Sequence, residues 1–189
     1  MVVKGKKQLT IIGLVGFPGS GKTTVAKYLE RKGFFSITLS DFIKEEIKKN
    51  NLGTFTRELL QDQGNKMRQR YGSHILAELA YKKIEQLRQK NIVVDGIRNV
   101  AEIRYLREKS HFTLVGVNAD SKIRYQRLLK KRGRDFVGSF ENFQKQEERE
   151  DHLGSQKIGL RVKDCFAQAD YIVKNEQTLA ELYTRLDDL

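Results

Sequence analysis

The chain has 189 residues and carries 36 Lys and Arg against 24 Asp and Glu, which gives a formal net charge of +12. This length is that of one ordinary domain, 1–189, and a hydrophobic fraction of 39% excludes a disordered chain. No apolar run approaches the ~20 residues that span a bilayer, so we expect no membrane association. The apolar stretch after the basic residues 1–7 is too short for a signal peptide, and the single cysteine, Cys165, cannot form an internal disulfide. A cytoplasmic protein, monomeric or homodimeric, is therefore expected.

Apolar runs with strand character alternate with amphipathic helical stretches along the chain. In chain order the pattern predicts a strand at 9–15, a helix at 23–32, a strand at 34–39, helices at 41–49, 56–70 and 73–89, strands at 92–94 and 112–117 joined through a helix, a helix at 121–131, a strand at 171–173 and a helix at 178–189. The helix at 41–49 is expected to start at a cap formed by Ser40 and Asp41. Short, continuous, β-branched strands are typical of parallel sheets buried on both faces. The alternation predicts an α/β fold with right-handed crossovers and no domain boundary.

The positive charge is concentrated in one segment. Residues 122–134 hold seven basic side chains and no acid, whereas 141–151 hold five acids and two bases. This distribution favours a local site for a small polyanion such as a nucleotide, although a solvated helix face and a nucleic-acid partner both remain open.

Residues 16–23 match the pattern G-x-x-x-x-G-K-[ST] at every fixed position, between a predicted strand and a predicted helix. Glycines let the backbone wrap an anion, and successive N–H groups at the helix start then point at a β-phosphate. Lys22 would reach the β and γ oxygens, and the Thr23 hydroxyl would ligate Mg²⁺. The alternative is a chance glycine-rich turn. The residues expected to bind ATP here are Gly16, Pro18, Gly19, Ser20, Gly21, Lys22, Thr23 and Thr24.

Two aspartates end predicted strands, where α/β sheets bind ligands. Asp95 follows the strand at 92–94 and is placed to hold Mg²⁺ through water, with helix capping as the alternative. Asp41 follows the strand at 34–39, and either binds the acceptor, acts as a base or only caps the next helix.

Five segments follow one another along the chain. They are the phosphate loop, Leu39-Ser40-Asp41, Thr56-Arg57-Glu58-Leu59-Leu60-Gln61 with Gly64 and Arg68, Val94-Asp95-Gly96-Ile97-Arg98, and Ala169 to Asn175. Together they resemble the P-loop nucleoside/nucleotide kinase superfamily, with the greatest likeness to dephospho-CoA kinase and deoxynucleoside monophosphate kinase. Some relatives carry a fused deoxycytidylate deaminase domain, whose zinc motifs H-x-E and P-C-x-x-C this chain lacks. The resemblance implies a three-layer sandwich around a five-stranded parallel sheet, with an acceptor-binding helical insertion at about 41–90 and a lid at about 127–150.

The resemblance also implies roles for individual residues. Arginine forks bind phosphate oxygens bidentately, and Arg57, Arg68 and Arg98 are placed to grip an acceptor phosphate, with a surface arginine as the alternative for each. Asn175 is placed to contact the adenine, or is only a turn asparagine. The lid arginines that would close over the donor and the transferring phosphoryl group are Arg127, Arg132 and Arg134. Lys44 stands where an arginine is common, which leaves the acceptor open.

We therefore expect an ATP-dependent phosphotransferase that uses Mg²⁺, with Lys22, Asp41, Arg98, Arg132 and Arg134 as its catalytic residues. The preferred acceptor is a (deoxy)nucleoside monophosphate, and dephospho-CoA is the alternative. No N-K-x-D motif supports a GTPase, but ATP over GTP as donor stays open. A nucleotide-dependent regulator that binds nucleic acid is a third hypothesis, because the chain is strongly basic.

Overall fold

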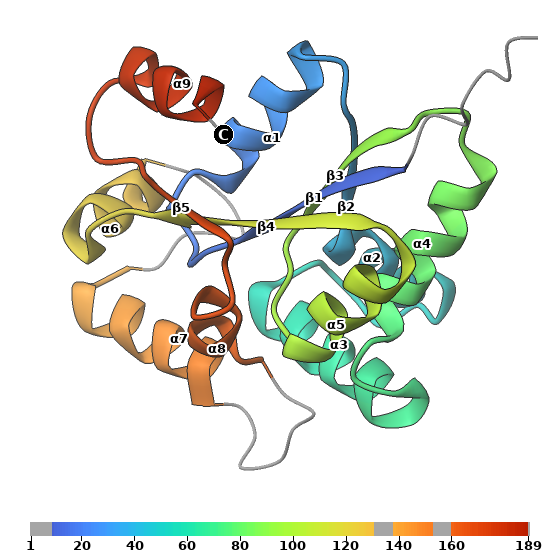
Figure 1. Cartoon of the computed structure of the whole chain (residues 1–189). Coiled ribbons are helices and arrows are strands. Elements are labelled where there is room, and N and C mark those ends of the chain that lie inside the picture. Colours follow the sequence, from blue (N-terminus) through green and yellow to red (C-terminus); the bar gives the residue numbers. More distant parts are fainter. Residues whose placement is uncertain (1–8, 131–137, 153–159, 189) are drawn as a thin grey trace, which may run out of the picture.

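The computed structural model describes residues 9–130, 138–152 and 160–188, which build a central sheet with helices on both faces (Figure 1). The sheet has five strands in the order β2-β3-β1-β4-β5, and every pairing is parallel. The strands are β1 (Thr10–Val15), β2 (Phe35–Thr38), β3 (Asn91–Asp95), β4 (His111–Asn118) and β5 (Tyr171–Lys174). Each lies within two residues of its predicted bounds, because buried β-branched runs define the strands.

Helices separate successive strands, as parallel pairing requires. Their bounds are α1 (Lys22–Arg31), α2 (Leu39–Lys49), α3 (Arg57–Tyr71), α4 (Ile75–Gln86), α5 (Val100–Lys109), α6 (Ser121–Leu129), α7 (Phe140–His152), α8 (Val162–Phe166) and α9 (Leu179–Asp187). Three consecutive helices, α2 to α4, connect β2 to β3 and form the expected insertion. No helix within the described ranges is long and apolar enough to cross a membrane.

Two apolar cores lie on opposite faces of the sheet. Leu14 and Val93 pack with residues of α1 and α9 on one face. Their chain neighbours Val15, Ile92 and Val94 point to the other face and pack with residues of α2, α3, α4, α5 and α8. In Figure 1, α1 and α9 lie above the sheet and α2 to α5 lie below it. The three-layer α/β sandwich predicted from the sequence is thereby confirmed.

The predicted start of α2 is wrong by two residues. Thr38 is the N-cap and the helix begins at Leu39, so Ser40 and Asp41 lie within its first turn and do not cap it. Leu39 is buried in the core directly after β2, and the strand passes into the helix without a linker.

The helices α6 and α7 form a small third cluster beside the sheet. Phe143 of α7 is buried, and its ring packs on Tyr125 of α6 at a centroid distance of 5.6 Å. Arg124 of α6 pairs with Glu147 of α7. Most of the predicted lid, 127–150, lies in these two helices, whereas 131–137 fall outside the described residues.

Candidate functional site

The phosphate loop connects β1 to α1, and Gly19 and Gly21 are two of the positions where it requires glycine. Gly19 and Gly21 have φ values of +79° and +103°, which disfavour any residue with a side chain. A Cβ on Gly19 would also lie 2.7 Å from the carbonyl oxygen of Arg124, and one on Gly21 would lie 2.1 Å from Nδ2 of Asn175. These glycines therefore keep both the loop conformation and its close packing against neighbouring segments.

Lys22 is the first residue of α1, and its side chain turns back over the phosphate loop. Its Nζ donates hydrogen bonds to the carbonyl oxygens of Gly16, at 2.7 Å, and of Phe17, at 3.3 Å. The ammonium group thus lies inside the loop, where a bound phosphate would meet it.

Asn175 and Arg127 brace the phosphate loop from outside. Nδ2 of Asn175, a buried residue directly after β5, donates to the carbonyl oxygen of Ser20 at 2.8 Å. Arg127 of α6 donates to the carbonyl oxygens of Asn175, at 2.9 Å, and of Gly19, at 3.3 Å. Both residues line the same cavity as the loop. Contact of Asn175 with adenine stays a prediction, and its bond to the loop is a role that the sequence reasoning missed.

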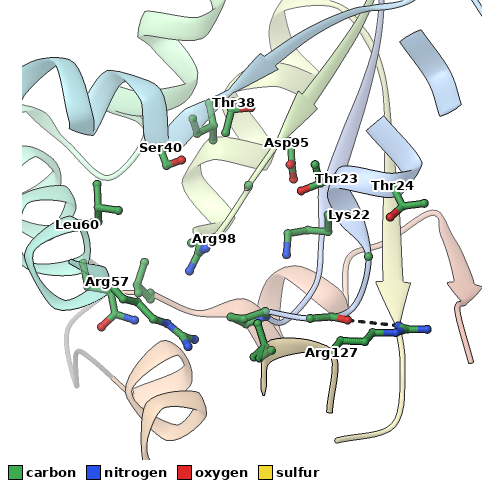
Figure 2. A pocket seen from close by; sticks show the side chains of 18 of the residues that line it. Lys22, Thr23, Thr24, Thr38, Ser40, Arg57, Leu60, Asp95, Arg98 and Arg127 are labelled. Atoms are coloured by element: carbon green, nitrogen blue, oxygen red, sulfur yellow. Dashed lines mark hydrogen bonds between the residues drawn. The ribbon is translucent and has the colours of Figure 1, made fainter. Parts of the chain in front are cut away.

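Asp95 ends β3 beside β1, where Leu14 is its partner in the sheet register. Its side chain is buried, and among the described residues its Oδ1 has no hydrogen-bond partner. Burial raises the pKa of this carboxyl, and the nearby charges of Lys22 and Arg98 oppose the rise. Figure 2 shows Asp95 pointing toward Thr23, and both side chains line the cavity.

The pair formed by Thr23 and Asp95 fits Mg²⁺. This ion is usually held by one or two carboxylates together with water and substrate phosphates, and needs no cage of protein ligands. Asp95 Oδ1 is a buried oxygen without a partner, as such a ligand would be before binding. Within the described ranges, no group of three or more His, Cys, Asp or Glu side chains could hold a metal ion.

The cavity extends from the phosphate loop to the insertion, and its volume is about 600 Å³. Arg57 of α3 and Arg98 of the loop between β3 and α5 line it as well (Figure 2). Aliphatic side chains also line the cavity, among them Ile43, Leu60 and Leu76 of the insertion and Leu160. The described residues that line the cavity include six basic side chains, Lys22, Arg57, Arg68, Arg98, Arg127 and Lys130, and one carboxylate, Asp95. This excess of basic groups favours an anionic ligand.

The charge of Asp41 acts on Asp95 and helps to raise the pKa of that carboxyl, but the Asp41 side chain does not line the cavity. Its exposed side chain pairs with Lys44 one turn along α2, and Asp41 is absent from the described residues that line the cavity. Its neighbours Thr38 and Ser40 line the cavity instead. The sequence reasoning did not select these two hydroxyls, because the predicted start of the helix was misplaced.

Arg68 lies at the cavity wall, but its guanidinium is buried in an ion pair. Nη2 and Nε donate to Oε1 of Glu102 at 2.8 and 3.2 Å, and both side chains are almost fully buried. Glu102 was also missed, although the spacing N-x-x-E from Asn99 is a capping-box signal. Arg132 and Arg134 lie outside the described residues.

The loop geometry and the parallel sheet define a P-loop protein with the α/β fold of small kinases. A family described as "AAA domain" matches residues 12–150. The chain is 32% identical to a UPF0200 protein of Sulfurisphaera tokodaii over 181 residues, which cover 96% of each chain. It is 30% identical to a UPF0200 protein of Methanocaldococcus jannaschii over 184 residues, which cover 96% of this chain and 89% of the relative. The chain belongs to the UPF0200 protein family.

Solved structures with the same fold include kinases. TT1252 from Thermus thermophilus superposes with a TM-score of 0.64 at 19% identity, over 96% of each chain. Shikimate kinase from Acinetobacter baumannii, in complex with shikimate, superposes with a TM-score of 0.57 at 18% identity, over 96% of this chain and 93% of that chain. At these identities the likeness establishes the fold.

Proposed function

We propose that this protein is an ATP-dependent phosphotransferase that moves the γ-phosphate to a small phosphorylated acceptor, in first place a (deoxy)nucleoside monophosphate. One observation carries the proposal: the phosphate loop and two arginines from other segments, Arg57 and Arg98, line a single cavity. The loop, here called the donor end, and the two arginines, here called the acceptor end, would bind the two phosphate groups between which the phosphoryl group passes.

On this proposal the donor end works by positioning and by offsetting charge. The loop amides would hold the β-phosphate, and Lys22 would leave its carbonyl partners for the β and γ oxygens. Thr23 and Asp95 would hold Mg²⁺, which when bound offsets negative charge on the donor phosphates. Arg127 would keep the loop in shape through its bonds to Gly19 and Asn175.

The acceptor end favours a phosphate over a hydroxyl. A hydroxyl acceptor gains from a carboxylate that takes its proton, whereas a phosphate acceptor is already anionic and needs positive neighbours. Asp41, the expected base, is exposed and paired with Lys44. Asp95, the one carboxylate among the described lining residues, faces Thr23 at the donor end. The arginines thus support a nucleoside monophosphate over dephospho-CoA.

A screen of acceptors tests the proposal. The full chain is incubated with ATP and Mg²⁺, and ADP release is followed with each nucleoside and deoxynucleoside monophosphate, with dephospho-CoA and with shikimate, the ligand of the structural neighbour. Lys22→Met is the matched control, since it keeps the length of the side chain and removes its charge. We expect release with one or a few monophosphates in the wild type alone.

Three other outcomes would contradict the proposal. Release with dephospho-CoA or shikimate alone would make the acceptor a hydroxyl. Release that no acceptor increases would indicate a simple ATPase. Salt-dependent binding to DNA or RNA without acceptor-dependent ADP release would favour the nucleic-acid-binding regulator. The observation that supports this alternative is the net charge of +12.

A further inference from the structure

The carboxylate of Glu102 contacts two separate walls of the acceptor end. Glu102 lies in the first turn of α5 and is fully buried. Its Oε2 accepts hydrogen bonds from the backbone N–H groups of Arg98, at 2.9 Å, and Asn99, at 3.1 Å. A capping box explains the bond to Asn99, because this residue is the N-cap of α5. The bond to Arg98 extends beyond the helix into the loop that lines the cavity.

The other oxygen of the same carboxylate binds the insertion. Oε1 accepts Nη2 and Nε of Arg68, which lies on α3, 34 positions earlier in the chain. Four N–H donors therefore surround one buried carboxylate. A buried ion pair is costly to desolvate, so stability alone is a weak reason to keep one, and fixing a particular arrangement is the better-attested use. Here the arrangement that is fixed is that of α3 against the loop before α5.

The backbone of Arg98 is held from its other side as well. Its carbonyl oxygen accepts the N–H of Arg161 at 2.9 Å, and Leu160, the residue before, lines the cavity. With its N–H bound by Glu102 and its carbonyl bound by Arg161, the Arg98 backbone cannot turn without breaking one of these bonds. The side chain that it carries enters the cavity facing Lys22 (Figure 2).

We propose that Glu102 is a positioning residue for the acceptor: it fixes Arg98 in the geometry that binds the acceptor phosphate and holds α3 against it. Arg68 is then the buried partner of this carboxylate, and it acts through Glu102. The proposal rests on the phosphotransferase function proposed above, since it needs an acceptor phosphate at Arg98.

Glu102→Gln tests the proposal, because an amide has one oxygen to accept and an NH₂ group that would face either the backbone N–H groups or Arg68. Loss of a hydrogen bond to a charged group weakens binding by about tenfold. We expect Glu102→Gln to raise the KM for AMP, or for the best monophosphate of the screen, about tenfold. The KM for ATP should stay within about twofold, since the donor end does not contact Glu102.

Glu181→Gln is the matched control. Glu181 is the acidic residue of the second capping box, on α9, where its Oε2 accepts the N–H of Thr178 at 2.9 Å. It is exposed, and among the described residues its carboxylate binds the backbone and the hydroxyl of Thr178, so its replacement should leave the acceptor KM unchanged. Should Glu102→Gln not fold, Glu102→Asp keeps the charge for Arg68 but withdraws the carboxylate by one methylene. A smaller rise in the same KM is then expected.

A double variant separates positioning from general damage. If Glu102 acts through Arg98, adding Glu102→Gln to Arg98→Ala should raise the acceptor KM by less than about twofold, because the side chain to be positioned is gone. A full tenfold rise in the Arg98→Ala background would overturn the proposal, and so would an equal rise in the KM for ATP. Either result would leave Glu102 a structural residue only.

Hydrogen exchange of the Arg98 and Asn99 amides, followed by NMR, gives a readout that needs no turnover. Glu102→Gln should speed the exchange of both amides and leave β3 unchanged. Faster exchange with an unaltered acceptor KM would refute positioning while the proposed function stands. If the wild type transfers phosphate to no acceptor, the proposed function fails and the positioning role falls with it, whatever the exchange shows.

Discussion

Replacing Asp95 by asparagine should make the ligand-free protein more stable while it weakens activity that depends on Mg²⁺. The Asp95 carboxylate is buried, and its Oδ1 lacks a partner among the described residues. A buried group left without a hydrogen bond costs about 1–3 kcal/mol, and more when it is charged. The charges of Lys22 and Arg98, and a hydrogen bond between the carboxylate and the backbone of Gly96, offset part of that cost. Asparagine has nearly the same shape and no charge to desolvate.

We expect Asp95→Asn to raise the free energy of unfolding by about 1–2 kcal/mol at pH 8 without ligand. For a chain of this length that corresponds to a Tm higher by about 3–6 °C. The gain should depend on pH, because burial raises the folded-state pKa of Asp95 above its ordinary value of about 3.9. The folded protein therefore holds this proton more tightly than the unfolded chain does. The resulting contribution to the free energy of unfolding is fully present below a pH of about 3.9 and is lost as the pH rises through the folded-state pKa. The two proteins should therefore differ little at pH 4 and most at pH 8.

Thermal unfolding from pH 4 to pH 8, with EDTA, measures this difference in stability. The same experiment with Mg²⁺ and a non-hydrolysable ATP analogue measures how much the bound ligand stabilises each protein. The ligand should stabilise the wild type more than the variant, since a ligand at 100 times its Kd adds about 2.7 kcal/mol and the variant binds Mg²⁺ less well. Asp41→Asn is the matched control, because its carboxylate is exposed, and it should change stability by less than about 0.5 kcal/mol. If Asp95→Asn is the less stable protein at pH 8 without ligand, the carboxylate is satisfied in the free protein and the assignment as a vacant Mg²⁺ ligand is wrong.

Three further predictions concern the donor end. Lys22→Met should lower kcat at least about 100-fold and leave the Tm nearly unchanged, because it removes charge beside the phosphates and no core packing. ADP release measures kcat and thermal unfolding measures the Tm. A kcat within about tenfold of the wild type would contradict a role of Lys22 in phosphoryl transfer. Gly21→Ala should abolish binding of a fluorescent ATP analogue, since its Cβ would lie 2.1 Å from Nδ2 of Asn175, and Gly33→Ala, where a Cβ would meet nothing within 4 Å although φ is also positive, is its control. Arg132→Ala and Arg134→Ala should each lower kcat more than they raise the Kd of ATP, as measured by titration, and an effect on Kd alone would exclude a role in the closed state.

The placement of the acidic residues shows how far sequence reasoning extends. The predicted strands put both Asp41 and Asp95 at the carboxyl edge of the sheet. In the structure Asp95 is the last residue of β3, and Asp41 follows β2 within the first turn of α2. Asp95 belongs to the sheet itself, and its neighbour in the register fixes where it points. Asp41 belongs to a helix, where each residue turns the direction of the side chain by about 100°. The helix α2 starts two residues earlier than predicted. In this helix the carboxylate of Asp41 pairs with Lys44, whereas the hydroxyls of Thr38 and Ser40 line the cavity.

The arginines of the insertion show the same limit. The family resemblance implied that Arg57, Arg68 and Arg98 grip an acceptor phosphate, and all three line one cavity. It gave no sign that Arg68 pairs with Glu102, because this pairing joins two helices that are separated by α4 and β3 in the chain. The local spacing N-x-x-E fits a capping box completely and offers no hint of a second partner.

The sequence by itself determined the donor end of this protein, including the phosphate loop, the helix that follows it and the parallel sheet that presents them. These features depend on residues that are consecutive or regularly spaced, so that backbone conformation and hydrophobic periodicity specify them locally. Only the tertiary structure decided which carboxylate lies in the cavity, that Asn175 braces Ser20, and that Glu102 joins Arg68 to the Arg98 loop. Each of these contacts depends on how far two distant elements are rotated and shifted when their apolar faces pack, and no local spacing in the chain encodes that rotation.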